Sequence, residues 1–245
     1  MTVKILKQYN SQNFDNRSKN TKIKYIILHY TETDNLIQAV NILNDKIRKV
    51  SSHYVIDQDG MIYQLVDDSL RAWHAGLSYW KKDINLNDNS IGIEIVNKGE
   101  PSKNKFSDLQ IEKLIALLQF LIHKYQISKY NILGHSDVAP TRKIDPGIFF
   151  PWKQLFSFSI GLPIYSNYRK INLRPLDELT LQKFFNNLDY IGYSQIEIKK
   201  NLNKKNLSIV NAFHRHFYPI LLNKDPNYTS FEISEKLKQD IRKKV

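Results

Sequence analysis

Residues 134–147, GHSDVAPTRKIDPG, combine side chains that a surface turn does not need. His135 follows a glycine, Asp145 follows ten residues later before Pro-Gly, and Lys143 lies just before the acid. A second histidine, His29, lies at the end of the apolar run KYIILHY, which is typical of a buried strand. Histidines at the junction of strands and loops lie where sheet proteins usually place their functional sites.

These residue types suit a metal. His29, His135 and Asp145 would give zinc two imidazoles and one carboxylate, with a fourth position open for water. Water bound in such a site ionises near neutral pH and can attack a carbonyl. The chain has no cysteine, so any metal site must use His, Asp, Glu and water. A histidine at the end of a strand is also often a hydrogen-bonded packing residue, and the spacing alone leaves both interpretations open.

Glu94 is the other unusual residue, because it stands among isoleucines in NSIGIEIVN. Strand alternation places it on the same face as Gly92, which leaves room for a group to approach. Glu94 is either a carboxylate on a solvated sheet face or a general base near a metal-bound water. Lys143 is either a solvated loop cation or a group that stabilises an oxyanion. The spacing alone favours the solvated interpretation for each residue taken singly.

Hydrophobic periodicity predicts the elements that position these residues. Strands are expected at 24–30, 89–97 and 130–135, and a hairpin at 53–66 around Asp59-Gly60. A short helix is expected at 35–46, and a long amphipathic helix begins at a capping box formed by Ser107 and Gln110.

The pattern changes after residue 159. Residues 160–176, with two prolines, are typical of a linker, and residues 177–245 predict three short helices without strands. We therefore expect an α/β catalytic domain at 1–159, built around one sheet, and a small three-helix domain at 177–245.

Composition limits the classes of protein. The 245 residues carry a formal charge of +12, which indicates an anionic partner. No run of apolar residues is long enough for a transmembrane helix, and the polar N-terminus lacks the apolar core of a secretory signal. A nucleic-acid-binding protein is the interpretation from charge alone, but no RNP-like, zinc-finger or bZIP pattern is present.

Six segments in order, IILHYT, SSHYVIDQDG, AWHAG, NSIGIEIVN, GHSDVAPTRKIDPG and FPW, resemble the zinc-dependent N-acetylmuramoyl-L-alanine amidases of the type-2 amidase family. The likeness is to the AmiD/AmpD branch and covers roughly residues 20–155. Six separated motifs that match together are highly specific. The resemblance implies a central mixed β-sheet flanked by helices and one zinc ion per chain.

The resemblance also implies roles for individual residues. The zinc ligands fall on His29, His135 and Asp145, and the catalytic residues on Glu94 and Lys143. The AWHAG segment, with Trp73, His74 and Ala75, matches residues that line the muropeptide cleft. Arg142 either pairs with a carboxylate of the stem peptide or is a solvated cation.

The C-terminal region has its own likeness. LQKFFNNLDYIGY and LSIVNAFHRHF resemble the small three-helix peptidoglycan-binding domain that often accompanies AmiD-type amidases. The family's usual glutamine before the final aromatic is replaced here by His214. A purely structural helical cap is the alternative interpretation.

The expected reaction is hydrolysis of the amide between the lactyl group of N-acetylmuramic acid, or its 1,6-anhydro form, and L-alanine of the stem peptide. The alternative is a non-catalytic peptidoglycan-recognition protein, although such proteins lose ligands that this chain retains. The expected partner is peptidoglycan or a muropeptide, not nucleic acid, and a monomer is the default. The C-terminal likeness favours the bacterial cell envelope or periplasm, whereas the missing signal favours the cytoplasm; the envelope is our expectation.

Overall fold

A six-stranded sheet forms the centre of the protein in a computed structural model that describes residues 3–165, 171–198 and 202–243. Its strand order is β1-β5-β4-β9-β3-β10. Every neighbouring pair is parallel except β4 and β5, which form the predicted hairpin. The strands are β1 (Ile5–Leu6), β3 (Tyr25–Tyr30), β4 (Tyr54–Ile56), β5 (Ile62–Gln64), β9 (Ser90–Ile95) and β10 (Ile132–Gly134). The prediction of a mixed central sheet is confirmed.

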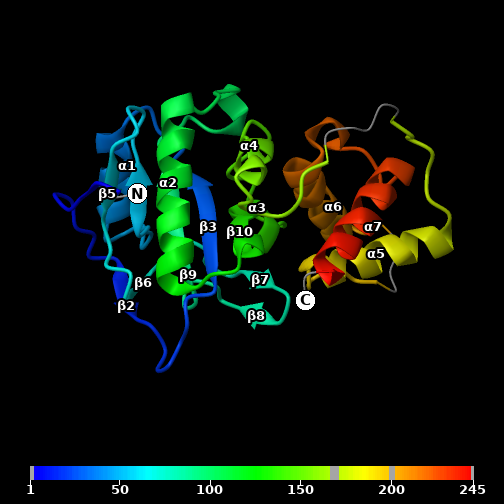
Figure 1. Cartoon of the computed structure of the whole chain (residues 1–245), viewed down its shortest axis with the longest axis horizontal. Coiled ribbons are helices and arrows are strands. Elements are labelled where there is room, and N and C mark those ends of the chain that lie inside the picture. Colours follow the sequence, from blue (N-terminus) through cyan, green and yellow to red (C-terminus); the bar gives the residue numbers. More distant parts are fainter. Residues whose placement is uncertain (1–2, 166–170, 199–201, 244–245) are drawn as a thin grey trace.

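Helix α2 (Asp108–Tyr125) covers one face of the sheet (Figure 1). It begins at the predicted capping box, in which the side chains of Ser107 and Gln110 each bond the other residue's backbone N–H. Its apolar stripe packs on alternate strand residues, among them Ile26, Leu28 and Ile93. Each such fully buried aliphatic side chain stabilises the fold by about 1.5–3 kcal/mol.

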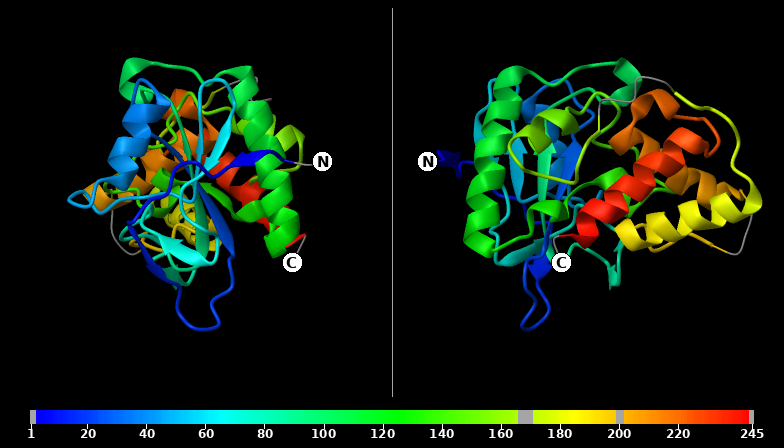
Figure 2. Two further views of the ribbon diagram at one scale, coloured as in Figure 1. Left: turned by 90° about the vertical axis from the view of Figure 1, so that its left-hand side faces the viewer. Right: turned by 45° about the vertical axis from the view of Figure 1, so that its right-hand side comes forward.

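Helix α1 (Leu36–Asn44) covers part of the opposite face. It packs on the hairpin strands through Leu36, Val40 and Leu43, which contact Val55 and Tyr63. Figure 2 (left) shows α1 and α2 on opposite sides of the strands. The middle of this face, beside α1, is left to the polar residues of β3 and β9.

Two small antiparallel pairs border that polar area. Strand β2 (Phe14–Asn16) pairs with β6 (Leu70–Ala72), and β7 (Tyr79–Trp80) pairs with β8 (Asp83–Ile84). The short helices α3 (His135–Val138) and α4 (Trp152–Ser157) follow β10.

Three helices, α5 (Glu178–Ile191), α6 (Lys204–Phe217) and α7 (Tyr228–Arg242), form the C-terminal region, as predicted (Figures 1 and 2). Each begins at a side-chain cap, supplied by Asp177, Asn203 and Asn227. Within the described residues, no helix has the length and apolar character needed to cross a membrane.

The C-terminal helices share a hydrophobic core with the sheet. Tyr25, Ile27 and Leu133, from β3 and β10, belong to the same buried cluster as Phe184 and Phe213. Residues 160–163 of the predicted linker are buried as well. The predicted domain boundaries at 159 and 177 stay a prediction, and the continuous core makes them testable by truncation.

Candidate metal centre and catalytic site

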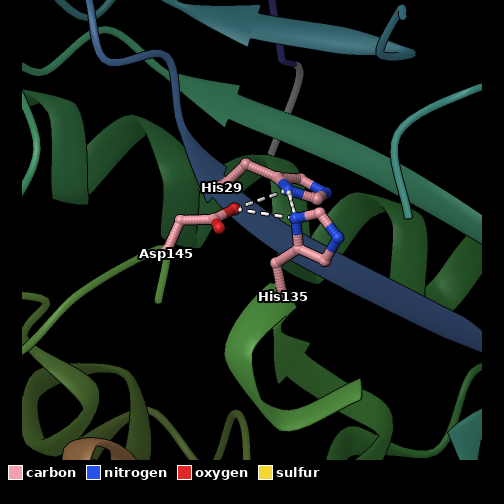
Figure 3. Close-up of side chains that lie close together, drawn as sticks. All are labelled: His29, His135 and Asp145. Atoms are coloured by element: carbon pink, nitrogen blue, oxygen red, sulfur yellow. Dashed lines mark hydrogen bonds and ion pairs between the residues drawn. The ribbon is translucent and has the colours of Figure 1, made fainter. Parts of the chain in front are cut away.

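Three side chains that are far apart in the sequence converge at the carboxyl ends of β3 and β10 (Figure 3). Nδ1 of His29 lies 3.0 Å from Nδ1 of His135 and 2.9 Å from Oδ2 of Asp145. Nδ1 of His135 lies 3.0 Å from the same carboxylate oxygen. The three are buried, and they are the potential metal-binding group found among the described residues.

The local backbone explains this convergence. His29 is the fifth residue of β3, and His135 is the first residue of α3, directly after β10. Because β3 and β10 are parallel neighbours, their carboxyl ends meet at one edge of the sheet. The loop that carries Asp145 is tied back to α3, because the backbone N–H of Ser136 donates to the carbonyl oxygen of Asp145 over 2.8 Å.

Burial and charge set the ionisation of this group. Burial, together with the charge that His135 can carry, lowers the pKa of His29 to about 4. Burial alone would raise the pKa of Asp145, but the two imidazoles beside it, His135 above all, hold it below its usual value. At neutral pH, His29 is therefore neutral and Asp145 is ionised, which are the forms that bind a metal.

The outer nitrogens of both imidazoles also have partners. Nε2 of His135 donates to the carbonyl oxygen of Ala75 over 3.1 Å, and Nε2 of His29 lies 3.1 Å from Nδ1 of His74. Bonds of this kind fix the ring orientation of metal-binding histidines. They leave the two Nδ1 atoms directed at Asp145.

Glu94 stands beside this group. It pairs with His29 in the register of β9 and β3, so both side chains lie on the same face of the sheet. Its Oε2 is buried and has no hydrogen-bond partner. Burial raises the pKa of Glu94 well above its usual value, with Asp145 adding to the rise and Lys143 opposing it. A buried, unsatisfied carboxylate oxygen next to three potential ligands is suited to hold a water molecule or accept a proton.

A cavity of about 730 Å³ opens over these residues. Its lining includes eight of the nine residues named from the sequence, all except Ala75: His29, Trp73, His74, Glu94, His135, Arg142, Lys143 and Asp145. The larger cavity, of about 910 Å³, lies elsewhere and contains none of them.

Ala75 and Arg142 take part in hydrogen bonds that involve backbone carbonyl groups beside the site. Ala75 is fully buried, and its carbonyl oxygen accepts from His135 and from the guanidinium of Arg142. Arg142 donates a further bond of 2.7 Å to the carbonyl oxygen of Leu77. The guanidinium therefore holds the segment that follows Trp73, and the pairing of Arg142 with a stem-peptide carboxylate stays a prediction.

Ser90 is a site residue that the sequence analysis did not single out. It is fully buried, and its hydroxyl lies 3.1 Å from Nε2 of His74. The signal was available, because the alternation that places Gly92 and Glu94 on one face of β9 places Ser90 there too.

The family described as N-acetylmuramoyl-L-alanine amidase (Amidase_2) matches residues 19–148. AmiD of Escherichia coli K12 is 33% identical over 238 residues, which are 88% of this chain and 82% of AmiD. AmpD of Haemophilus influenzae is 33% identical over 171 residues, covering 62% of this chain and 90% of that protein.

Solved structures agree over nearly the whole chain. E. coli AmiD in complex with the substrate anhydro-N-acetylmuramic acid-L-Ala-D-gamma-Glu-L-Lys superposes with a TM-score of 0.79 at 31% identity, covering 91% of this chain and 92% of AmiD. AmpDH3 of Pseudomonas aeruginosa in complex with anhydromuramic pentapeptide gives a TM-score of 0.74 at 26% identity, with coverage of 91% and 95%.

Proposed function

Because the chain belongs to the Amidase_2 family and is an N-acetylmuramoyl-L-alanine amidase, we propose that its cavity binds muropeptides and that His29, His135 and Asp145 hold a zinc ion. The bond cleaved joins the lactyl group of N-acetylmuramic acid to L-alanine of the stem peptide. This reaction belongs to the turnover and recycling of the bacterial cell wall.

The donor set supports zinc. Two neutral imidazole nitrogens and one carboxylate oxygen are a common three-ligand set for catalytic zinc, with a fourth position left for water or substrate. A zinc ion held there supplies Lewis acidity, which polarises a carbonyl and makes water ionise near neutral pH. The ligand atoms of the three residues all lie within 4.8 Å of one another, close enough to share one ion.

Glu94 acts as the general base and then as the general acid. Its free Oε2 takes a proton from the attacking water, and the protonated carboxyl later gives that proton to the leaving amine of L-alanine. The raised pKa of Glu94 favours the second step, because a carboxyl group that binds its proton more tightly stays protonated until the amine departs.

Lys143 lines the same cavity and stabilises the negative oxygen of the tetrahedral intermediate. Trp73 also lines the cavity and offers an apolar ring surface to the substrate. The anhydromuramyl peptides bound by the similar AmiD and AmpDH3 structures support 1,6-anhydro-muropeptides as substrates here. Fractionation of cells that carry the full-length chain tests the expected location in the envelope.

The decisive experiment measures metal content and product together. The full chain should contain about one zinc per molecule and release free stem peptide from an anhydro-N-acetylmuramyl tripeptide, detected by mass spectrometry. A chelator should stop the release, and added zinc should restore it. His135→Ala should bind no zinc and release nothing, whereas His123→Ala, on the exposed side of α2, should match the wild type.

Other outcomes separate the alternatives. A recognition protein would bind the muropeptide without releasing peptide from it. A nucleic-acid-binding protein would bind DNA with a steep salt dependence and would contain no zinc. If the chelator-treated protein and His135→Ala both released stem peptide at the full rate, the proposed mechanism would be wrong.

A further inference from the structure

We propose that His74 is a positioning residue for the zinc ligand His29, and that a hydrogen-bond chain through Ser90 to the backbone fixes which nitrogen of His29 faces the metal. The proposal rests on the metal site of the proposed function. It gives the histidine of the AWHAG segment a different task from contact with the muropeptide.

The last acceptor of the hydrogen-bond chain determines which group donates in each of its bonds. The carbonyl oxygen of Leu86 can only accept, so the hydroxyl of Ser90, 2.5 Å away, donates to it. The same hydroxyl then accepts from Nε2–H of His74 over 3.1 Å. With its proton on Nε2, a neutral His74 presents a bare Nδ1.

His74 therefore determines the tautomer of His29. The bare Nδ1 of His74 accepts from Nε2–H of His29 over 3.1 Å. A neutral His29 with its proton on Nε2 presents the lone pair of Nδ1 to Asp145 and His135. His135 is held in the same tautomer by the carbonyl oxygen of Ala75. Three acceptor atoms then converge with no proton among them, which is favourable around a cation.

Packing holds the His74 ring in place. A Cβ atom at Gly92 would lie 2.4 Å from Cγ of His74, so the ring occupies the space that only glycine leaves on β9. The backbone N–H groups of His74 and Ala75 both donate to Oδ1 of Asn87, over 3.1 and 2.7 Å. His74 is only 8% exposed, and its ring meets that of His29 edge-on at a centroid distance of 5.2 Å.

This packing reinterprets Gly92. The sequence indicates only that a group approaches the sheet at this position. The structure assigns that group as the imidazole of His74. Glycine is needed at position 92 because the positioning histidine lies against the strand, and the substrate cavity opens beyond it.

The test compares two substitutions of similar shape at position 74, of which only one carries a hydrogen-bond acceptor. In His74→Asn, Oδ1 can take the place of Nδ1 and still accept from His29. His74→Leu introduces an apolar side chain, similar in shape to asparagine, that has no acceptor. Ser90→Ala leaves the imidazole in place and removes the acceptor of its Nε2–H. His123→Leu, an exposed histidine on α2, is the matched control.

Two readouts are measured on each purified full-length protein. The first is zinc affinity by competition with a chromophoric chelator, and the second is the tautomer of His29 by 15N NMR of the metal-free protein. We expect the Nε2–H tautomer in the wild type, a mixture of tautomers in His74→Leu, and zinc binding weakened about 10- to 100-fold in that variant. His74→Asn should recover most of the affinity, and Ser90→Ala should lose part of it.

The proposal is overturned if His74→Leu and Ser90→Ala, folded as judged by circular dichroism, bind zinc as tightly as the wild type and keep its His29 tautomer. If His74→Leu does not fold, Ser90→Ala decides by the same two readouts. A wild type that binds zinc but releases no stem peptide would count against the proposed function alone, because the affinity comparison needs no catalysis.

Discussion

Nδ1 of His216, on α6, lies 2.7 Å from Oδ2 of Asp137, two residues beyond the metal-ligand candidate His135 in α3. Both side chains are almost completely buried. The hydroxyl of Tyr193 donates to the other carboxylate oxygen, Oδ1, also over 2.7 Å. The C-terminal region therefore binds directly to the short helix that begins with His135, whatever its affinity for glycan.

The bond from Tyr193 gives a first prediction. Tyr193→Phe removes one hydroxyl and leaves a buried carboxylate with one donor fewer, so the free energy of unfolding should fall by about 1–3 kcal/mol. Urea denaturation of the full chain measures it. Tyr190→Phe is the matched control, since Tyr190 is 41% exposed, and it should change stability by less than about 0.5 kcal/mol. Equal effects of the two substitutions would mean that the bond to Asp137 contributes nothing.

A truncated chain that ends at residue 165 gives the second prediction. Removal of α5–α7 would expose the face of the core that includes Tyr25, Ile27 and Leu133. We expect a lower melting temperature and binding of an apolar dye, because the exposed patch is too large for a stable monomer. If the truncated protein melts like the full chain, residues 1–159 fold independently, as the predicted boundaries require.

The local part of the structure could be predicted from the sequence. The alternation of NSIGIEIVN places Glu94 and Gly92 on one face because side-chain direction in a strand depends only on neighbouring residues. The capping box at Ser107 and the hairpin at Gly60 are equally local. His29, His135 and Asp145 were identified mainly because six motifs occur together, since the spacing alone left a packing role open.

The long-range contacts could not be predicted. His216 and Asp137 are 79 residues apart, and neither the helical pattern of α6 nor the loop motif indicates its partner. The order of donors and acceptors in the hydrogen bonds that lead from His29 to the carbonyl oxygen of Leu86 depends on which groups are adjacent in space, so it could be read only from the structure. The role of Arg142 could not be predicted either, because its hydrogen bond to the backbone carbonyl of Leu77 leaves no signal in the sequence.

The third prediction concerns Glu94. Glu94→Gln keeps the size of the side chain but cannot take a proton from water, so kcat should fall about 10²- to 10⁴-fold. Zinc content should stay at the wild-type level, because Glu94 is not among the three potential ligands. Activity assays with an anhydro-muropeptide measure kcat, and metal analysis of the same sample measures the zinc content. Loss of zinc together with activity would instead place Glu94 among the groups that hold the metal.

The fourth prediction concerns Lys143, an exposed residue at the cavity. Lys143→Met removes the charge and should lower kcat about 10²- to 10³-fold, with KM changed much less, because the charge acts on an oxyanion that is absent from the bound substrate. Lys143→Arg keeps the charge and should recover part of the rate. A rise in KM with kcat unchanged would show that Lys143 binds the substrate and does not stabilise the intermediate.

The fifth prediction concerns acid stability and His214, whose Nε2 contacts the hydroxyl of Ser230 in α7. Burial lowers the pKa of His214 to about 4, while the unfolded chain has the usual value of about 6.5. Between these values the unfolded state binds the extra proton, so the stability that His214 contributes is complete above pH 6.5 and is lost as the pH falls toward 4. Since one pH unit corresponds to about 1.4 kcal/mol for a single proton, the loss reaches about 3 kcal/mol.

His214→Gln isolates this effect. Glutamine does not titrate, and its amide can replace the 2.8 Å contact between Nε2 of His214 and the hydroxyl of Ser230. The free energy of unfolding, measured by urea denaturation from pH 7 to 4, should therefore fall less steeply in the variant than in the wild type. The other buried histidines are common to both proteins and cancel in the difference. Parallel curves for the two proteins would mean that His214 titrates normally in the folded state.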